Sequence, residues 1–368
     1  MIEISDAALS TLMGFGGGCV LGLAARLARF CTLGAIEDAY YGGSRERILM
    51  WPLALGVSIF TSFLLADLDL ADLDASVYLR FELSLIASIA GGAMFGVGMA
   101  LAGNCGFGAL SRLGGGDIRS LLIVLVIGVA AYAAAIGPLA ELRLALFPRT
   151  EIAESTPPGL AHLIQRQFGI PALAAAAIIA VLLIGIALLD KGFRRDGSAL
   201  FWSAMVGLTI ASGWWGTTWI SENGFDVVSI ESHTFTMPLG EGLLQLMTSA
   251  GEGVGFSVGS VLGVIVGAFV GAMAMGQFKW EACDDPRELS RQLFGAILMG
   301  VGGVIALGCS VGQGMSAFSV LAVSAPVTAA SIGIGAVIGL RYLVEGSPLA
   351  DAITTAGSRL ANRLRRGM

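Results

Sequence analysis

Apolar residues fill nine long segments of this chain, and short polar or Gly-containing stretches separate these segments. We place them at about 8–28, 48–66, 79–101, 118–139, 170–189, 199–220, 253–276, 292–308 and 324–343. A helix of about 20 predominantly apolar residues is long enough to cross a lipid bilayer. The pattern therefore predicts an all-α polytopic membrane protein with about nine transmembrane helices.

The composition supports a membrane protein and argues against several soluble classes. Of the 368 residues, 55% are hydrophobic and only 13% are charged, whereas a soluble domain carries about 25% charged residues. The start of the chain, residues 1–10, is acidic and runs into a full-length apolar segment, so we expect no cleavable signal peptide. A basic stripe with interleaved aromatic residues is missing, and we expect no nucleic-acid partner.

The basic residues predict the orientation. They gather in alternate loops and in the tail, at Arg45, Arg47, Arg112, Arg119, Lys191, Arg194, Arg195, Lys279, Arg287, Arg291, Arg359, Arg363, Arg365 and Arg366. Cytoplasmic loops are enriched in Lys and Arg, which predicts an inner (cytoplasmic) membrane, an outer N-terminus and a cytoplasmic C-terminus. The acidic loop 67–74 then faces outward, and Arg143, Arg149 and Arg166 are exceptions in an outer loop.

Four Gly-containing segments are too apolar for exposed loops and too short to cross a membrane. They are residues 30–43, 102–109, 232–241 and 308–314. Non-helical backbone at membrane depth is tolerated where protein buries it or where it lines a cavity. We therefore expect short re-entrant helices at these breaks, lining a pathway. Trp214, Trp215 and Trp219 fit an aromatic belt at the membrane interface.

An offset of 204 residues relates the two halves of the chain. It places 95–110 on 299–314 and Cys105 on Cys309. A single segment, 170–189, lies between two halves of four helices each. One extra crossing of the membrane gives the second half the opposite orientation, an inverted repeat typical of transporters. We predict a first repeat at 1–145, a linking region at 146–198, a second, inverted repeat at 199–345 and a cytoplasmic basic tail at 346–368. The offset also pairs Glu37 with Glu241, which we interpret as structural carboxylates, for instance bonding N–H groups at a helix start.

Cysteine supplies the candidate chemistry. The five are Cys19, Cys31, Cys105, Cys283 and Cys309, without a CxxC pair or a Cys/His metal spacing. Cys31, Cys105 and Cys309 each occupy a break, whereas we interpret Cys19 as a small buried hydrophobe and Cys283 as incidental. Buried thiols stay neutral and can donate hydrogen bonds to a sulfur-containing anion. Thiolates holding a soft metal such as Cu(I) and thiol–disulfide electron transfer are the alternatives.

Three motifs resemble those of the YeeE/YedE family of inner-membrane sulfur transporters. They are Arg29-Phe-Cys-Thr-Leu-Gly-Ala35, Gly103-Asn-Cys-Gly-Phe-Gly108 and Gly308-Cys-Ser-Val-Gly-Gln-Gly314. The resemblance implies uptake of thiosulfate or a related sulfur-containing anion, relayed by S–H contacts along three cysteines. It implies a transporter rather than an enzyme, with no cofactor and no metal. The substrate-binding candidates are Cys31, Cys105, Cys309, Gly34, Asn104, Gly106, Gly308 and Gln313.

The resemblance also bears on partners. Some members of that family work with a small soluble sulfur-carrier domain. Because we expect this chain to end at its basic tail, such a cytoplasmic carrier protein would be a separate partner, besides membrane lipid and the anion. A membrane thiol–disulfide oxidoreductase and a soft-metal permease remain the alternative functions at this point.

Overall fold

The computed structural model describes residues 5–81, 84–148, 159–225, 228–248, 255–282 and 285–346. Within these ranges the chain is built from helices, without named strands. The long helices are α1 (Asp6–Leu27), α3 (Glu46–Asp67), α5 (Leu85–Ala102), α7 (Ile118–Ala135), α10 (Ala172–Leu189), α12 (Gly197–Asn223), α14 (Phe256–Ala274), α15 (Pro286–Ile305) and α17 (Ser324–Glu345). Each coincides with one predicted apolar segment, and the all-α polytopic class is confirmed.

Seven of the long helices are long and apolar enough to cross a membrane, counting only the part of the chain that the structure describes. The other two are α12 and α15. Helix α15 opens on a charged turn with Arg287 and Glu288, and α12 carries several Ser, Thr and Trp residues. The total of nine crossings therefore stays a prediction.

Two helices, α5 and α15, start about six residues away from the predicted positions, and local capping explains both. The segment expected from residue 79 begins as a long helix at Leu85, because the Ser84 hydroxyl accepts from the Ala87 N–H at 3.4 Å. The segment expected from residue 292 already begins at Pro286, where the Asp285 carboxylate caps the helix. Pro is favoured at the first helical position, so polar residues extend this helix beyond its apolar stretch.

Short elements connect the long helices. They are α2 (Thr32–Glu37), the π-helix η1 (Asp38–Gly42), α4 (Val77–Arg80), α6 (Gly106–Gly114), α8 (Ala140–Leu146), α9 (Leu160–Phe168), α11 (Lys191–Arg195), α13 (Met237–Thr248), the π-helix η2 (Gly312–Ser316) and α16 (Ala317–Ser319). Helices α2, α6, α13 and η2 fall in or directly beside the four predicted breaks. The expectation of short helices at these breaks is confirmed.

Glycine allows the helix backbones to approach closely. Helix α1 packs along α14, where a Cβ on Gly18 would overlap the carbonyl oxygen of Ser260. A Cβ on Gly267 would likewise overlap the carbonyl oxygen of Cys19. Membrane helices associate through such small-residue contacts, because lipid removes the hydrophobic driving force between them. The abundant glycines therefore contribute to packing as well as to the breaks.

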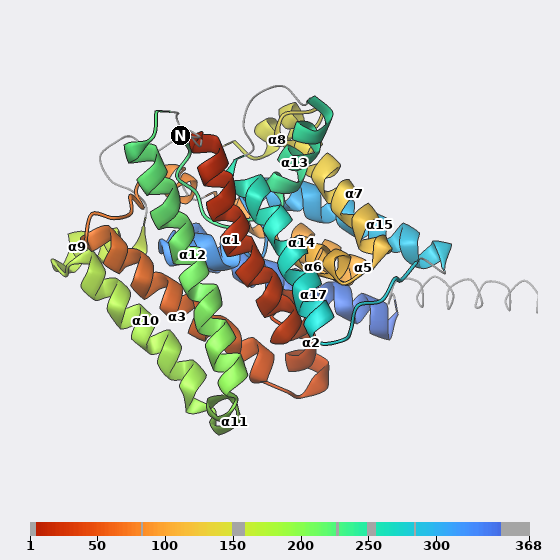
Figure 1. Ribbon diagram of the computed structural model, residues 1–368, viewed down its shortest axis with the longest axis horizontal. Coiled ribbons are helices and arrows are strands. Elements are labelled where there is room, and N and C mark those ends of the chain that lie inside the picture. Colours follow the sequence, from red (N-terminus) through yellow and green to blue (C-terminus); the bar gives the residue numbers. More distant parts are fainter. Residues whose placement is uncertain are drawn as a thin grey trace, which may run out of the picture.

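The long helices pack in pairs that correspond between the halves. Helix α1 packs on α14 and α12 packs on α3, while α5 packs on α17 and α15 packs on α7. A shift of about 204 residues along the chain relates the α1–α14 pair to the α12–α3 pair, and the α5–α17 pair to the α15–α7 pair. In Figure 1, α1 descends from the N-terminus, whereas α12 rises from α11 at the lower edge. We propose on this basis that the inverted repeat holds; the tail after residue 346 lies outside the described residues.

The core of the molecule forms where the breaks meet. Cys105, Cys309 and Phe235 are almost completely buried there, together with Phe95 and Met99. Trp214 is also completely buried, and its ring N–H donates to the Ser319 hydroxyl at 2.8 Å. Its assignment to an interfacial aromatic belt was wrong, because this side chain faces the protein interior.

Candidate functional site

Each of three cysteines lies at a point where the backbone leaves one element and begins another. Cys31 is the N-cap of α2, and Cys105 is the N-cap of α6. Before Cys105 the chain turns at Gly103 with φ of 77°, and before Cys309 it turns at Leu307 and Gly308 with φ of 62° and 155°. Glycine adopts positive φ without steric cost. The breaks thus place Cys31 and Cys105 at helix starts and Cys309 in the turn just before η2.

Cys31 and Cys105 lie on either side of one glycine. A Cβ on Gly108 would lie 3.7 Å from the Cys105 sulfur and 3.9 Å from the Cys31 sulfur. The Cys105 sulfur accepts a hydrogen bond from the Gly108 N–H at 3.4 Å. The Cys309 thiol and the Ser310 hydroxyl also lie close enough to Cys105 to interact with its thiol. The structure therefore brings the three predicted cysteines into one cluster.

Cys309 is held by the irregular segment 228–236. Its sulfur accepts from the N–H groups of Phe235 and Gly312, both at 3.3 Å, and lies 3.7 Å from the Thr234 hydroxyl. The Phe235 ring packs on Phe107, with ring centroids 5.3 Å apart. Phe235, which takes the place of Cys31 in the second half, therefore contacts both buried cysteine breaks.

Buried polar atoms without hydrogen-bond partners surround the cysteines. They include both amide atoms of Asn104, Oε1 of Gln313, and the hydroxyls of Thr32 and Thr236. The Gln313 amide nitrogen is bound, because it donates to the Ala306 carbonyl at 2.9 Å. Buried polar groups in proteins are nearly always satisfied. Such a group of unsatisfied atoms beside the thiols is a place where a polar ligand or water would be stabilised.

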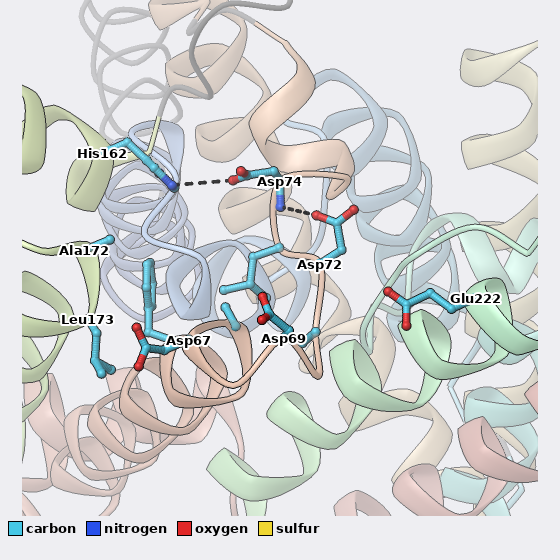
Figure 2. A pocket seen from close by; sticks show the side chains of 12 residues that line it. Asp67, Asp69, Asp72, Asp74, His162, Ala172, Leu173 and Glu222 are labelled. Atoms are coloured by element: carbon cyan, nitrogen blue, oxygen red, sulfur yellow. Dashed lines mark hydrogen bonds and ion pairs between the residues drawn. The ribbon is translucent and has the colours of Figure 1, made fainter.

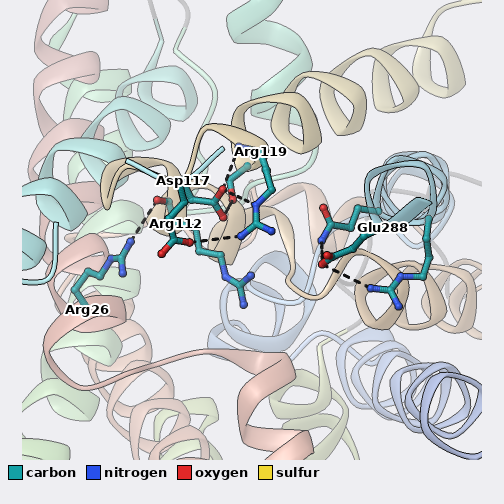
Figure 3. Close-up of polar contacts among 9 residues, drawn as sticks. Arg26, Arg112, Asp117, Arg119 and Glu288 are labelled. Carbon is teal, nitrogen blue, oxygen red and sulfur yellow. Dashed lines mark hydrogen bonds and ion pairs between the residues drawn. The ribbon is translucent and has the colours of Figure 1, made fainter. Parts of the chain in front are cut away.

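Arg26 fixes helix α6 at the end opposite Cys105, and Figure 3 shows its guanidinium pointing toward Arg112 of the last turn. The Arg26 guanidinium donates to the Ser111 carbonyl at 2.8 and 3.2 Å and to the Arg112 carbonyl at 3.3 Å. A cation at the C-terminal end balances the negative end of the helix dipole. The partial positive charge at the N-terminus of α6 is then directed at Cys105 and Asn104.

One cavity leads to Cys309, and we call it the Glu231 cavity. It has a volume of about 370 Å³, and its lining includes Thr234 and Gly308 beside Cys309. Arg143, Glu231 and Glu241 supply its charges. The Glu231 carboxylate accepts from the Ser257 hydroxyl at 2.6 Å. Burial, with a smaller contribution from the charge of Glu241, raises the pKa of Glu231 to about 7.

Sequence reasoning missed Glu231 and misplaced Glu37 and Glu241. The candidate break began at residue 232, one position too late, although Glu231 is an acid in an apolar surrounding and therefore a functional candidate. Glu37 ends α2 and Glu241 lies in the second turn of α13, so neither carboxylate lies at a helix start as expected. Burial raises the pKa of Glu241. Glu241 lines the cavity instead of capping a helix.

A second cavity lies near Cys31, and we call it the Arg47 cavity. Its volume is about 350 Å³, and Arg29, Asp38 and Arg47 are among its lining residues. Arg47 donates to the Asp38 carboxylate at 2.9 Å and to the Arg29 carbonyl at 3.2 Å. A Cβ on Gly34 would overlap the Arg47 guanidinium. The structure thus places the candidate Gly34 beneath a cation, rather than beside the three sulfurs.

A third cavity, of about 380 Å³, is acidic and distinct from the cysteine cluster (Figure 2). Its acids are Asp67, Asp69, Asp72, Asp74 and Glu222, and His162 approaches the Asp74 carboxylate at 3.5 Å. This surface repels anions, and of the three cavities only the Glu231 cavity is lined by a residue that contacts the Cys309 sulfur.

The remaining cysteines do not join the cluster. Cys19 lies on α1 against Gly267 of α14, within a helix contact. Its interpretation as a packing residue agrees with this position, whereas Cys283 lies outside the described residues. Gly106 packs against the Phe235 carbonyl, at 2.9 Å from where its Cβ would lie. Gly106 therefore shapes the site by close backbone contact.

Comparison with known proteins agrees with this architecture. The family model described as "Sulphur transport" matches residues 27–338, which include all three cysteine breaks. The thiosulfate transporter TsuA of Spirochaeta thermophila is 24% identical over 320 residues, which cover 83% of this chain and 91% of that protein. The helices long enough to cross a membrane and the extent of the family match lead to one conclusion: the chain is a multi-pass membrane protein of the sulphur transport (YeeE/YedE) family.

Proposed function

We propose that this protein moves thiosulfate across the membrane, along the thiols of Cys309, Cys105 and Cys31. The observation that carries the proposal is the cluster of three thiols, of which Cys105 and Cys309 are buried, next to unsatisfied polar atoms of Asn104 and Gln313. The similarity to a thiosulfate transporter supports the choice of anion. Related sulfur-containing anions of the same size and charge are the other members of the substrate class.

The route begins at the Glu231 cavity and ends at the Arg47 cavity. Thr234 lies between the first cavity and Cys309, Gly108 lies between Cys105 and Cys31, and Arg29 next to Cys31 lines the second cavity. A neutral S–H group can donate to the terminal sulfur or an oxygen of thiosulfate without adding negative charge. Several weak sites in series permit both entry and release. Passage requires no covalent bond to any cysteine.

We also propose an orientation for this route in an inner membrane. The N-terminus lies outside and the C-terminus lies in the cytoplasm, as the Lys and Arg residues of α11 and of the loop before α3 indicate. The Glu231 cavity then opens outward and the Arg47 cavity inward. Reporter fusions after Asp74 and after Arg195 should lie on opposite sides, outside and inside. The same side for both would contradict this orientation.

Growth on thiosulfate tests the proposed function. A host that cannot take up sulfate or thiosulfate should grow with thiosulfate as the sole sulfur source only when it expresses this chain. Cysteine as the sulfur source provides the control for general fitness. Absence of growth, despite verified protein in the membrane, would contradict thiosulfate import. A separate sulfur-carrier protein, supplied from the same source organism, would be tested as a partner in the same assay.

Asn104→Leu should separate transport from stability. Replacing an unsatisfied buried amide by an apolar residue of similar size is close to neutral for folding, so we expect the melting temperature of the purified protein to stay within a few degrees of the wild-type value. The anion then has one polar partner fewer, worth about 1 kcal/mol, and uptake should fall about fivefold. A large decrease in thermal stability with normal uptake per folded molecule would show that Asn104 is structural.

A further inference from the structure

The Glu231 cavity combines opposite charges in a way that the cysteine route does not explain. Two carboxylates, Glu231 and Glu241, line the same cavity as one guanidinium, Arg143. A dianion that enters this cavity meets the attraction of one cation and the repulsion of two anions. Since like charges in a confined space of low dielectric repel strongly, entry is favourable only if the charge of the carboxylates is reduced.

Hydrogen bonds to different helices fix two charged groups of the cavity, Arg143 and Glu231. Arg143 of α8 donates to the carbonyls of Ala134 and Ala135 at 2.9 and 3.3 Å, so its cation is anchored at the end of α7. The backbone of Glu231 is fixed by the Thr217 hydroxyl of α12, which accepts from its N–H at 3.2 Å. The carboxylate is fixed by Ser257 of α14 at 2.6 Å. Glu231 therefore cannot leave the cavity without breaking its hydrogen bonds to two long helices.

Of the titratable groups that face the cavity, only the carboxylates are expected to gain or lose a proton near neutral pH. Tyr78 of α4 and Glu241 of α13 are its further titratable side chains. A tyrosine hydroxyl stays protonated at neutral pH, whereas a buried carboxyl that interacts with a second carboxylate binds a proton more readily. Residues Gly303–Leu307 of α15 and the following turn add only apolar or backbone groups. Among the lining residues that the structure describes, protonation of the Glu231–Glu241 pair is therefore the change that neutralises charge in this cavity.

We propose that the Glu231–Glu241 pair takes up a proton when the sulfur-containing anion enters the cavity, so that acid on the outer side promotes uptake. The inference rests on the proposed function and adds its dependence on protons. Binding of the anion and binding of the proton favour each other, and this coupling is reciprocal by thermodynamic linkage. Once the anion has moved on to Cys309, the affinity of the pair for the proton falls again.

The expected pH dependence follows from the sign of the coupling. Uptake is supported by the protonated pair, and it declines as the pH rises through the pKa of Glu231, which burial raises to about 7. The protonated fraction of a group with a pKa near 7 falls from about 0.9 at pH 6 to about 0.1 at pH 8. Thiosulfate uptake at low substrate concentration should therefore fall about tenfold over this interval.

Two measurements on the full chain test the inference. The first is uptake of radiolabelled thiosulfate into proteoliposomes with equal pH on both sides, from pH 6 to pH 8. The second is calorimetric titration of the purified protein with thiosulfate near pH 7, in two buffers of different ionisation enthalpy, which counts the protons taken up on binding. We expect the tenfold decline and, because a group with a pKa near 7 is already about half protonated at pH 7, an uptake of about half a proton per anion bound. Uptake that is independent of pH, or binding without proton uptake, overturns the inference and leaves thiosulfate transport standing.

Glu231→Gln, which resembles the protonated carboxyl, is the matched variant. Its uptake should equal that of the wild type at pH 6 and stay nearly constant to pH 8. Glu222→Gln, at a carboxylate of the acidic cavity, is the control and should keep the wild-type pH profile. A folded Glu231→Gln protein, verified by its melting temperature, that retains the tenfold decline contradicts the role of Glu231. If the wild type takes up no thiosulfate at any pH, the proposed function itself is overturned.

Discussion

Replacing Cys105 by Ala is expected to lower thiosulfate uptake about tenfold to hundredfold. Cys105 is completely buried and lies between Cys31 and Cys309 in the cluster, so this variant leaves the anion without a donor at the centre of the route. A buried, charge-bearing group that lacks one polar partner is destabilised by about 1–3 kcal/mol or more, which corresponds to that decrease in rate if this step limits passage. Uptake of radiolabelled thiosulfate, normalised to the amount of protein, measures the effect.

Matched cysteine variants make this result specific. Cys309→Ala should cause a decrease of similar size, whereas Cys19→Ala should leave uptake near normal, because Cys19 lies in the contact of α1 with α14. Serine at Cys105 should restore uptake only in part, since its hydroxyl is shorter and less polarisable than a thiol. Normal uptake by both Cys105→Ala and Cys309→Ala would end the relay proposal, even for a chain that transports thiosulfate.

Gly18→Leu is expected to have the largest effect on folding. A side chain at this position would overlap the Ser260 carbonyl of α14, and the backbone of Gly263 lies close by. Overpacking in a tight core commonly costs about 1–3 kcal/mol and more where backbone must move. Separation of α1 from α14 would also displace His233, which is bonded to Ser260 at 2.6 Å. We expect little monodisperse protein to remain in size-exclusion chromatography after detergent extraction.

The same helix offers a control for that variant. Gly16 is exposed, and a Cβ there meets no atom within 4 Å. Gly16→Leu adds the same side chain to the same helix without touching α14, and the yield of monodisperse protein should stay close to the wild-type value. Equal yields from Gly16→Leu and Gly18→Leu would contradict the close α1–α14 contact.

Much of the fold could be predicted because bilayer thickness imposes a length on apolar segments. Each of the nine predicted segments corresponds to a long helix, and the breaks at Gly103 and Gly308 were marked by glycines with positive φ. The helix starts at Leu85 and Pro286 were predicted less well, since capping side chains decide them and hydrophobicity does not. The orientation of Trp214 toward the protein interior could not be predicted from the hydrophobic pattern either, because its hydrogen-bond partner Ser319 is 105 residues away.

The candidate site could be predicted in part. Cysteines in Gly-containing breaks pointed to Cys31, Cys105 and Cys309, and the structure places these three together. The cavity at Glu231 could not be predicted, because its lining comes from several elements far apart in the chain. Gly34 was selected from its motif alone, although its close contact is with Arg47. Contacts between distant segments therefore limit sequence reasoning more than the local motifs do.

A structure of this protein with thiosulfate bound tests the central claim most directly. We expect density for the anion beside Cys105 or Cys309, with its terminal sulfur or an oxygen in contact with a thiol sulfur, and with polar contacts to Asn104 or Gln313. Thiosulfate found only at the lipid-facing surface or in the acidic cavity, in a protein that transports the anion, would contradict it.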